Sequence, residues 1–381
     1  MPLTITPENI CFTNPAAKYA PGETVRGTIE LFLLKDYKVR YMHFKVKGVG
    51  KNSRNGVDNV TKVKYFNQEV LAWDEKHDHS NIMYEGRHTF PFSFSVPIDC
   101  PPTFHSAFGD IQYYGKITMV LLDHALPLTA ERCFTVTPRR LSAVRYLELQ
   151  NDDNMLWHRS KKVKGVVFNS GRINAMYTIS KKVIVPGESV SITARLINES
   201  RKILRDVSIE LHRVTQYYSA SNFCYKTDKH IECSTDPFIL DVKPGEMKSG
   251  TYTLFVPQEV AQAFNARIIT VSYVIQMRIK MSGLMARDIV FKEPVLVATK
   301  PSRTELAAVE GYAARSSSLF NTVTVPRQLN LWINEGLTLG ALMGEEDDGD
   351  NSQPPTYAEA TASDEYPPSY DEAIRESREN A

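Results

Sequence analysis

Two short motifs near the C-terminus combine residue types whose spacing suits peptide recognition. They are Pro354-Pro355-Thr356-Tyr357 and Pro367-Pro368-Ser369-Tyr370, and Glu-Ala follows each of them after one further residue. Paired prolines favour the polyproline II conformation, so little conformational entropy is lost when such a segment binds. WW domains bind these segments in aromatic-lined grooves, and the tyrosine adds a planar anchor with one hydroxyl group. These PPxY motifs predict WW-domain binding through Pro354, Pro355, Tyr357, Pro367, Pro368 and Tyr370.

Other candidate sites in the sequence are weaker. His77-Asp78-His79 supplies two histidines without a third metal ligand, which is typical of solvated side chains. Gly48-Val49-Gly50 lacks the third glycine of a nucleotide-binding loop. Pro101-Pro102-Thr103-Phe104 lacks the tyrosine of a PPxY motif and lies among predicted strands, so it indicates a turn. The 381 residues contain no nucleophile elbow, zinc-protease motif or phosphate-binding loop. We therefore expect no enzyme activity, no catalytic or metal-binding residues and no cofactor.

The cysteines indicate a reducing compartment. Their number is odd, they are scattered along the chain, and none forms a C-x-x-C pair. A disulfide framework or a zinc site would need paired or clustered spacing. We therefore expect free thiols in a cytosolic protein at Cys11, Cys100, Cys133, Cys224 and Cys233.

Charge is distributed unevenly along the chain, although the formal net charge is only +1. From residue 301 onward there are 5 arginines, no lysine and 15 acidic residues, a net charge of −10, so residues 1–300 carry +11. The spread of these cations over strands and the segment 159–164 favours solvated sheet surfaces that attract the chain's own acidic tail. The alternative is a patch for acidic lipid headgroups or phosphorylated cargo tails. Nucleic acid is not an expected partner, because the cations are not concentrated beside exposed aromatic residues.

Alternating apolar and polar residues dominate residues 1–300. Met42, Phe44 and Val46 share one face of a predicted strand, whereas Lys45 and Lys47 share the other. Such alternation is typical of antiparallel sheets with one buried and one solvated face. No window of about 11 to 18 residues shows a 3.6-residue period, so we expect almost no helix in this part. Short strands separated by Pro, Gly, Asn and Asp predict β-sandwiches.

The same part of the chain contains an internal repeat. Pro21-Gly22-Glu23-Thr24-Val25 matches Pro186-Gly187-Glu188-Ser189-Val190 at an offset of 165 residues, and each Pro-Gly pair predicts a type II turn that leads into a strand. Residues 92–97 match residues 252–257 at an offset of 160. A third match at that offset pairs Ile111, Tyr113, Ile117, Met119 and Leu121 with Val271, Tyr273, Met277, Ile279 and Met281. Three matches in one order indicate two copies of one domain.

These observations predict an all-β fold of two tandem immunoglobulin-type β-sandwich lobes followed by a disordered acidic tail. The expected limits are 1–152, 153–300 and 301–381, because the polar run 148–154 interrupts the strands and the composition of the tail cannot support a core. The N-terminus lacks the features of a signal peptide, and no stretch approaches the roughly 18 apolar residues of a membrane span.

One segment of the tail is an apolar exception. Leu329–Met343 contains Leu, Trp and Ile residues, and Asn321–Val325 just upstream alternates like a strand. This pattern is compatible with docking back onto an exposed sheet edge. The alternative is a disordered stretch or a short motif for another partner, which we favour slightly.

The tandem repeats, each with Pro-Gly-Glu-x-Val, together with the PPxY tail resemble the α-arrestins, also called arrestin domain-containing proteins. Residues 186–194 look like the start of the second arrestin lobe, and 273–277 resemble one of its late strands. The resemblance covers about residues 1–300 for the lobes and 354–370 for the motifs. It implies arrestin-like lobes and a non-enzymatic adaptor. Its PPxY motifs bind WW domains of HECT-type ubiquitin ligases, and its lobes engage membrane receptors or transporters as cargo, which are ubiquitinated and internalised.

The resemblance also implies a location and leaves one alternative function open. The implied location is the cytoplasm, with recruitment to the plasma membrane and endosomes. Only the six motif positions are carried over as binding residues, because no local motif marks a cargo surface. One branch of the family binds thioredoxin through a lobe cysteine and acts in redox or metabolic regulation. Cys224 and Cys233 lie in a roughly comparable stretch, but their flanking residues do not match, so buried or inert thiols are favoured.

Overall fold

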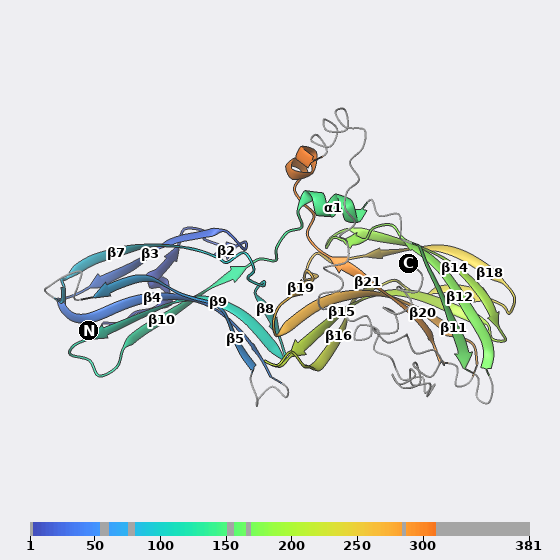
Figure 1. The fold of residues 1–381 in the computed structure, drawn as a ribbon, viewed down its shortest axis with the longest axis horizontal. Helices are drawn as coiled ribbons and strands as arrows, with labels where there is room; N and C mark the ends of the chain where they lie inside the picture. The colour runs from blue at the N-terminus through green and yellow to red at the C-terminus, as the bar shows by residue number, and fades with distance from the viewer. Residues whose placement is uncertain are drawn as a thin grey trace, which may run out of the picture. The chain divides into compact units, whose positions relative to one another are not determined.

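The chain folds into two lobes, each built from two β-sheets (Figure 1). The computed structural model describes residues 3–53, 61–74, 81–150, 156–164, 169–283 and 287–309. Residues 310–381 of the predicted tail (301–381) lie outside the described residues, and so does His77-Asp78-His79.

The first lobe contains a three-stranded and a seven-stranded sheet. The small sheet has the order β1-β3-β7, and a short 3₁₀ turn, Pro7–Asn9, precedes β1. Its strands are β1 (Ile10–Phe12), β3 (Thr24–Leu33) and β7 (Gly86–Ser95). The large sheet has the order β2-β10-β9-β4-β5, with β6 paired to β4 and β8 paired to β9. Its strands are β2 (Lys18–Tyr19), β4 (Tyr37–Asn52), β5 (Thr61–Asp74), β6 (Ile82–Met83), β8 (Phe104–Ser106), β9 (Gly109–Leu121) and β10 (Leu128–Val136).

The second lobe repeats this plan with one more strand in the small sheet. The small sheet has the order β11-β12-β14-β18. Its strands are β11 (Leu156–Lys164), β12 (Asn169–Ile179), β14 (Ser189–Ser200) and β18 (Met247–Phe255). The large sheet has the order β13-β21-β20-β15-β16, with β17 paired to β15 and β19 paired to β20. Its strands are β13 (Val183–Ile184), β15 (Leu204–Tyr218), β16 (Cys224–Ser234), β17 (Phe238–Val242), β19 (Phe264–Asn265), β20 (Ile269–Met281) and β21 (Ile289–Val297).

The alternation along β4 shows why these segments form sandwiches. Met42, Phe44 and Val46 are fully buried, as the sequence pattern predicts. The ring of Phe44 lies 4.6 Å, centroid to centroid, from that of Phe92 in β7 of the opposite sheet. Burying one such side chain contributes about 1.5–3 kcal/mol, so the apolar faces of the two sheets hold each sandwich together.

The internal repeat predicted from the sequence is visible in the turns. Gly22 and Gly187 have φ angles of +86° and +85°, the left-handed region that a type II turn requires at its third residue. The Gly22 amide donates to the carbonyl of Val96, and the Gly187 amide donates to that of Val256. The repeated motifs therefore form the same turn in both lobes, and in each lobe a backbone hydrogen bond joins this turn to the end of the equivalent strand.

A tyrosine occupies equivalent positions in both lobes. The hydroxyl of Tyr113 in β9 donates to the carbonyl of Pro101 at 2.5 Å, and that of Tyr273 in β20 donates to the carbonyl of Ala261 at 2.6 Å. Donor and acceptor are both offset by 160 residues between the lobes. Pro101 and Pro102 are buried in the connection that leads to β8, which agrees with their interpretation as an inter-strand turn.

Helix is scarce in the described part of residues 1–300, as expected. The helix α1 (Ala143–Gln150), which the sequence pattern did not reveal, follows the last strand of the first lobe, and residues 303–309 of the predicted tail form a second helical segment. Tyr146 and Leu149 of α1 pack with Val183 and Ala298, and Leu306 of the second helix packs against the same cluster. The two helices therefore lie together, as Figure 1 also shows.

The two lobes contact each other through the end of β4 and the β8–β9 hairpin. The side-chain amide of Asn52 donates to the carbonyls of Tyr218 and Ile268 at 2.9 and 2.8 Å. The hydroxyl of Tyr217 donates to that of Ser106 at 2.9 Å. Because Asn52 is only 1% exposed, these hydrogen bonds satisfy two second-lobe carbonyls where water has little access.

Gly27 in β3 is a position where the packing tolerates no side chain. A Cβ at this position would overlap the carbonyl oxygen of Cys11 and the ring of Phe92. We expect Gly27→Ala to lower the free energy of unfolding by about 1–3 kcal/mol, because overpacking forces the backbone or the ring to move. Chemical denaturation measures this change. Gly250→Ala is the matched control, since its Cβ would meet only the far end of the Tyr252 side chain, the hydroxyl at 3.1 Å and ring carbons at 3.3 and 3.6 Å. Equal midpoints for the two variants would contradict the expectation.

Candidate functional site

The outer face of the large first-lobe sheet carries a set of lysines that the fold brings together from three strands. The residues of this lysine face are Lys45, Lys47 and Lys51 of β4, Lys62 and Lys64 of β5, and Lys116 of β9. The sequence pattern indicated Lys45 and Lys47 as solvated residues of β4. The members from β5 and β9 could not be assigned to the same surface without the register of the strands.

Strand register places cations directly opposite one another on this surface. Lys45 faces Lys116 across the β4–β9 pair, and Lys51 faces Lys62 across the β4–β5 pair. Like charges in opposite positions destabilise a sheet unless anions neutralise them. Acids do so for two of the six lysines: Lys45 lies 2.9 Å from Glu69, and Lys116 lies 2.9 Å from Glu131.

The remaining lysines of the face are available to a ligand. No ion pair joins Lys47, Lys51, Lys62 or Lys64 to another described residue. The ammonium of Lys45 holds the pKa of the Glu69 carboxyl below its usual range, so that acid stays charged near neutral pH. Several ammonium groups on flexible stems suit anionic oxygens of varied geometry. The lysine face is therefore a candidate binding surface for an anionic partner.

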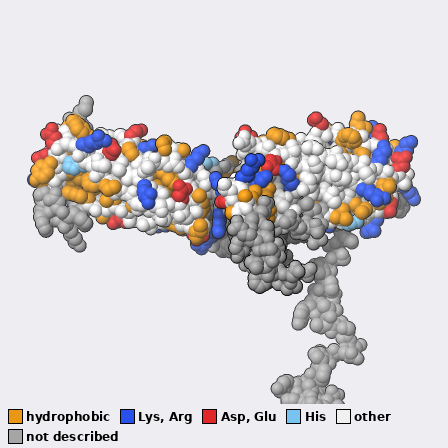
Figure 2. All heavy atoms as spheres, turned by 90° about the horizontal axis from the view of Figure 1, so that it is seen from above, with side chains coloured by type: hydrophobic (Ala, Val, Ile, Leu, Met, Phe, Trp, Pro, Cys, Tyr) orange, Lys and Arg blue, Asp and Glu red, His pale blue; other side chains and the backbone are white. Residues whose placement is uncertain are grey.

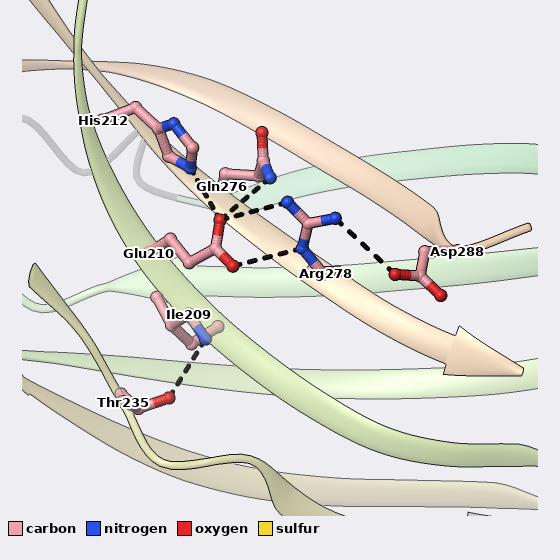
Figure 3. A network of polar contacts seen from close by, with 7 residues as sticks. All are labelled: Ile209, Glu210, His212, Thr235, Gln276, Arg278 and Asp288. Atoms are coloured by element: carbon pink, nitrogen blue, oxygen red, sulfur yellow. Dashed lines mark hydrogen bonds and ion pairs between the residues drawn. The ribbon is translucent and has the colours of Figure 1, made fainter. Parts of the chain in front are cut away.

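The corresponding surface of the second lobe neutralises its own charges. Glu210 of β15 accepts hydrogen bonds from His212 at 2.7 Å, Gln276 at 3.1 Å and Arg278 at 3.1 Å (Figure 3). Arg278 also lies 3.6 Å from Asp288. Burial alone would raise the pKa of Glu210, but the hydrogen bonds from Arg278 and His212 lower it on balance.

Basic and acidic side chains are interspersed over both lobes on the face drawn in Figure 2. On this face the positive charge is thus spread out and not gathered in one patch, in line with the sequence analysis. The lysine face differs from this background, because four of its six cations form no ion pair with a described residue, although Asp110 lies opposite Lys51 in the β4–β9 register.

The cysteines have no sign of activation. All five are free thiols, as expected. Burial raises the pKa of Cys100 and Cys233 to about 11 and also raises that of Cys133. Reactive thiols need a lowered pKa, so these three are poorly suited to redox exchange. Cys224 is partly exposed in β16, and its sulfur lies 3.6 Å from the carbonyl oxygen of Lys226.

The structure can also be compared with the predictions for the PPxY residues, for metal sites and for membrane spans. All six PPxY residues lie outside the described part of the chain. Within the described ranges, no group of three or more His, Cys, Asp or Glu side chains could hold a metal ion. No described helix is long and apolar enough to cross a membrane.

The paired sandwiches define an arrestin fold. Residues 9–140 match the family model "Arrestin (or S-antigen), N-terminal domain", and residues 169–302 match "Arrestin (or S-antigen), C-terminal domain". The two matches cover more than half of the chain and follow one another in the order of the two lobes. The chain belongs to the arrestin family, among the arrestin domain-containing proteins or α-arrestins, as its sequence features predicted.

Curated relatives carry the same family name. Arrestin domain-containing protein 15 of Caenorhabditis elegans is 23% identical over 197 residues, which is 49% of each chain. Human arrestin domain-containing protein 5 is 25% identical over 43% of this chain and 44% of that protein. Mouse arrestin domain-containing protein 4 is 22% identical over 91% of this chain and 80% of that protein. The match to the first two spans about half of their length.

Glu210 should make the stability of the second lobe depend on pH. Because its pKa is lowered in the folded state, the stabilisation is present above the usual carboxyl pKa of about 4.3 and is lost as pH falls further. We expect the unfolding midpoint to fall more steeply between about pH 5 and pH 3 in the unchanged protein than in Glu210→Gln. Thermal unfolding across this range measures the slopes. Exposed Glu259 provides the control, since Glu259→Gln should leave the slope as it is. Identical slopes for all three proteins would contradict the assignment.

Proposed function

We propose that this α-arrestin is a cytosolic adaptor that links HECT-type ubiquitin ligases to membrane receptors or transporters. The observation that carries the proposal is the presence of two PPxY motifs in a chain that also contains both arrestin lobes. The linked cargo would then be ubiquitinated, internalised by endocytosis and sorted. The adaptor would act in the cytoplasm and be recruited to the plasma membrane and endosomes.

The proposal assigns a separate task to each part of the chain. Residues 1–152 and 153–300 form the cargo-binding lobes, and residues 301–381 capture the ligase through Pro354, Pro355, Tyr357, Pro367, Pro368 and Tyr370. The lysine face supports contact with acidic segments of a cargo or with acidic lipid headgroups, because its free ammonium groups have no acidic partner among the described residues. In this scheme the protein performs no chemistry itself and needs no cofactor. It acts by raising the local concentration of one partner at the other.

The alternative of a thioredoxin-binding regulator has less support. Attack on a disulfide requires a thiolate, and burial raises the pKa of Cys100, Cys133 and Cys233. Cys224 is the remaining candidate in the comparable stretch of the second lobe. Pull-downs with isolated WW domains and with thioredoxin separate the two functions, and capture by thioredoxin alone would favour the alternative.

Ligase capture should depend on both tyrosines. Tyr357 and Tyr370 are 13 residues apart, and a flexible chain of this length has an r.m.s. span of about 18–22 Å. Such a span suits two neighbouring WW domains, whose joint binding strengthens affinity by about 10²–10⁴ over one site. We expect Tyr357→Ala or Tyr370→Ala to leave weak binding to a tandem-WW protein and the double variant to abolish it, as measured by calorimetry.

A control within the same tail isolates the motif effect. Tyr312→Ala removes a tail tyrosine outside both motifs and should bind like the unchanged protein. If the double variant still binds the tandem-WW protein with unchanged affinity, the ligase contact lies elsewhere and this part of the proposal fails.

The absence of lysine after residue 300 should determine where ubiquitin is attached. A ligase held at Tyr357 and Tyr370 has no acceptor amine beside its docking site, because arginine keeps the charge but does not accept ubiquitin. We expect modification only on lysines of residues 1–300 and on the cargo, with the cargo as the main acceptor. Peptide mapping after reconstituted ubiquitination measures this, and Arg375→Lys should create a modified site in the tail. Modification of the adaptor alone, with cargo untouched, would overturn the adaptor mechanism.

A further inference from the structure

β11 is an edge strand with an unusual concentration of positive charge. It pairs only with β12, so the hydrogen-bonding groups along its other side have no strand partner among the described residues. Its sequence, LWHRSKKVK, contains no acidic residue. The side chains of His158, Arg159, Lys161 and Lys162 are all exposed. Lysine-rich edges discourage pairing with other strands, but their charge also attracts acidic segments.

One of these cations, Arg159, forms an ion pair within the lobe and holds the strand in place. Arg159 places its Nε 2.8 Å from one carboxylate oxygen of Glu293 in β21 and a terminal nitrogen 3.0 Å from the other. Glu293 is only 2% exposed and also accepts a hydrogen bond from the hydroxyl of Tyr177 in β12 at 2.5 Å. A bidentate contact to a buried carboxylate ties β11 to the opposite sheet. Arg159 is therefore committed to an internal ion pair that fixes the strand.

The neighbouring cations remain free. No described residue forms an ion pair with Lys161, Lys162 or Arg172. Arg172 lies opposite Glu199 of β14 in the β12–β14 register, although no ion pair joins these two described residues. On its other side Arg172 lies directly opposite Lys162 in the β11–β12 register, so two like charges face each other. An anion bound between them would relieve this repulsion. Lys161 lies opposite buried Ile173, so its side chain projects from the other face of this edge strand. The three cations at this edge, Lys161, Lys162 and Arg172, are called the β11 strip below.

The chain itself contains an acidic segment that fits this strip. Glu345-Glu346-Asp347-Asp348-Gly349-Asp350 has five carboxylates in six residues. It begins 36 residues after the last described residue, Val309, and a flexible chain of that length has an r.m.s. span of about 30–36 Å. We propose that the β11 strip is the docking surface for this acidic segment of the same molecule.

Docking would bring the first ligase-binding motif to the second lobe. Pro354 follows Asp350 by four residues, so a docked acidic segment holds this motif close to β11. The contact consists of exposed charges, whose attraction salt screens. The Debye length is about 8 Å at physiological ionic strength and becomes shorter at higher salt, so added salt should weaken the contact. This inference goes beyond ligase capture and does not depend on it, since the tail can dock whether or not it binds WW domains.

The lysine-free tail permits a direct test on the full-length chain. A carbodiimide activates a carboxylate, which an amine attacks to form an amide and release the activator as a urea. Any cross-link from residues 345–350 must therefore end on a lysine of residues 1–300 or on the N-terminal amine. We expect peptide mapping to show links from the acidic segment mainly to Lys161 and Lys162, within one molecule, and their yield to fall with added salt.

Charge variants distinguish docking from chance encounters. Lys161→Arg keeps the charge and removes one amine, so links to Lys162 should persist. Reversing the charge at Arg172 by Arg172→Glu leaves both amines in place and should lower the yield at Lys161 and Lys162 about tenfold. Lys51→Glu with Lys62→Glu on the lysine face is the matched control and should leave that yield unchanged. An unchanged circular dichroism spectrum would establish that each variant is folded.

Several results would overturn the inference. They are links that end mainly on the lysine face, links between two molecules, or a yield at Lys161 and Lys162 that Arg172→Glu does not change. WW-domain binding is measured separately, by comparing the unchanged protein with the Tyr357→Ala/Tyr370→Ala variant. If the acidic segment does not dock but the motifs bind WW domains, this inference alone fails. If the acidic segment docks but the double variant still binds WW domains with unchanged affinity, the ligase-capture proposal alone fails.

Discussion

The strict alternation of buried and exposed side chains along the long strands is the constraint on which both lobes depend. In β4, Met42, Phe44 and Val46 are fully buried, and the residues between them point outward. A shift of one residue in register would exchange these two sets completely. The apolar core and the lysine face are thus fixed by the same register, because each inward residue determines where its neighbours must point.

The two lobes use equal frameworks for different surfaces. β4 and β15 occupy the same place in their sheets, between β9 and β5 in one lobe and between β20 and β16 in the other. On β4 the outward residues include lysines without acidic partners, whereas Glu210 on β15 is satisfied by His212, Gln276 and Arg278. The repeat therefore conserves turns and core positions while the outer faces differ. Of the two large sheets, that of the first lobe is therefore better suited to contact an anionic partner.

The sequence predicted those features that depend on local pattern. Strand alternation, the turns at Gly22 and Gly187, and the two-lobe repeat were confirmed because each is encoded within a few consecutive residues. The helix α1 is compatible with the expectation of almost no helix, and it could not be located from the sequence because its eight residues are shorter than the window in which a helical period becomes clear. The contact between Arg159 and Glu293 could not be foreseen, since these residues are 134 positions apart and meet only when two sheets pack.

The proposed function separates recognition by sequence from recognition by surface, and the two obey different physical limits. A PPxY motif contains its whole recognition pattern in four residues, so it needs no folded scaffold and gains from a preformed backbone conformation. A charged surface such as the lysine face needs the register of three strands to exist at all. The first can therefore be read from the sequence, whereas the second requires the fold. Residues 1–300 carry a net charge of +11, and the tail that follows carries −10. The acidic residues of the tail therefore compete with any anionic partner for the basic surface of the lobes.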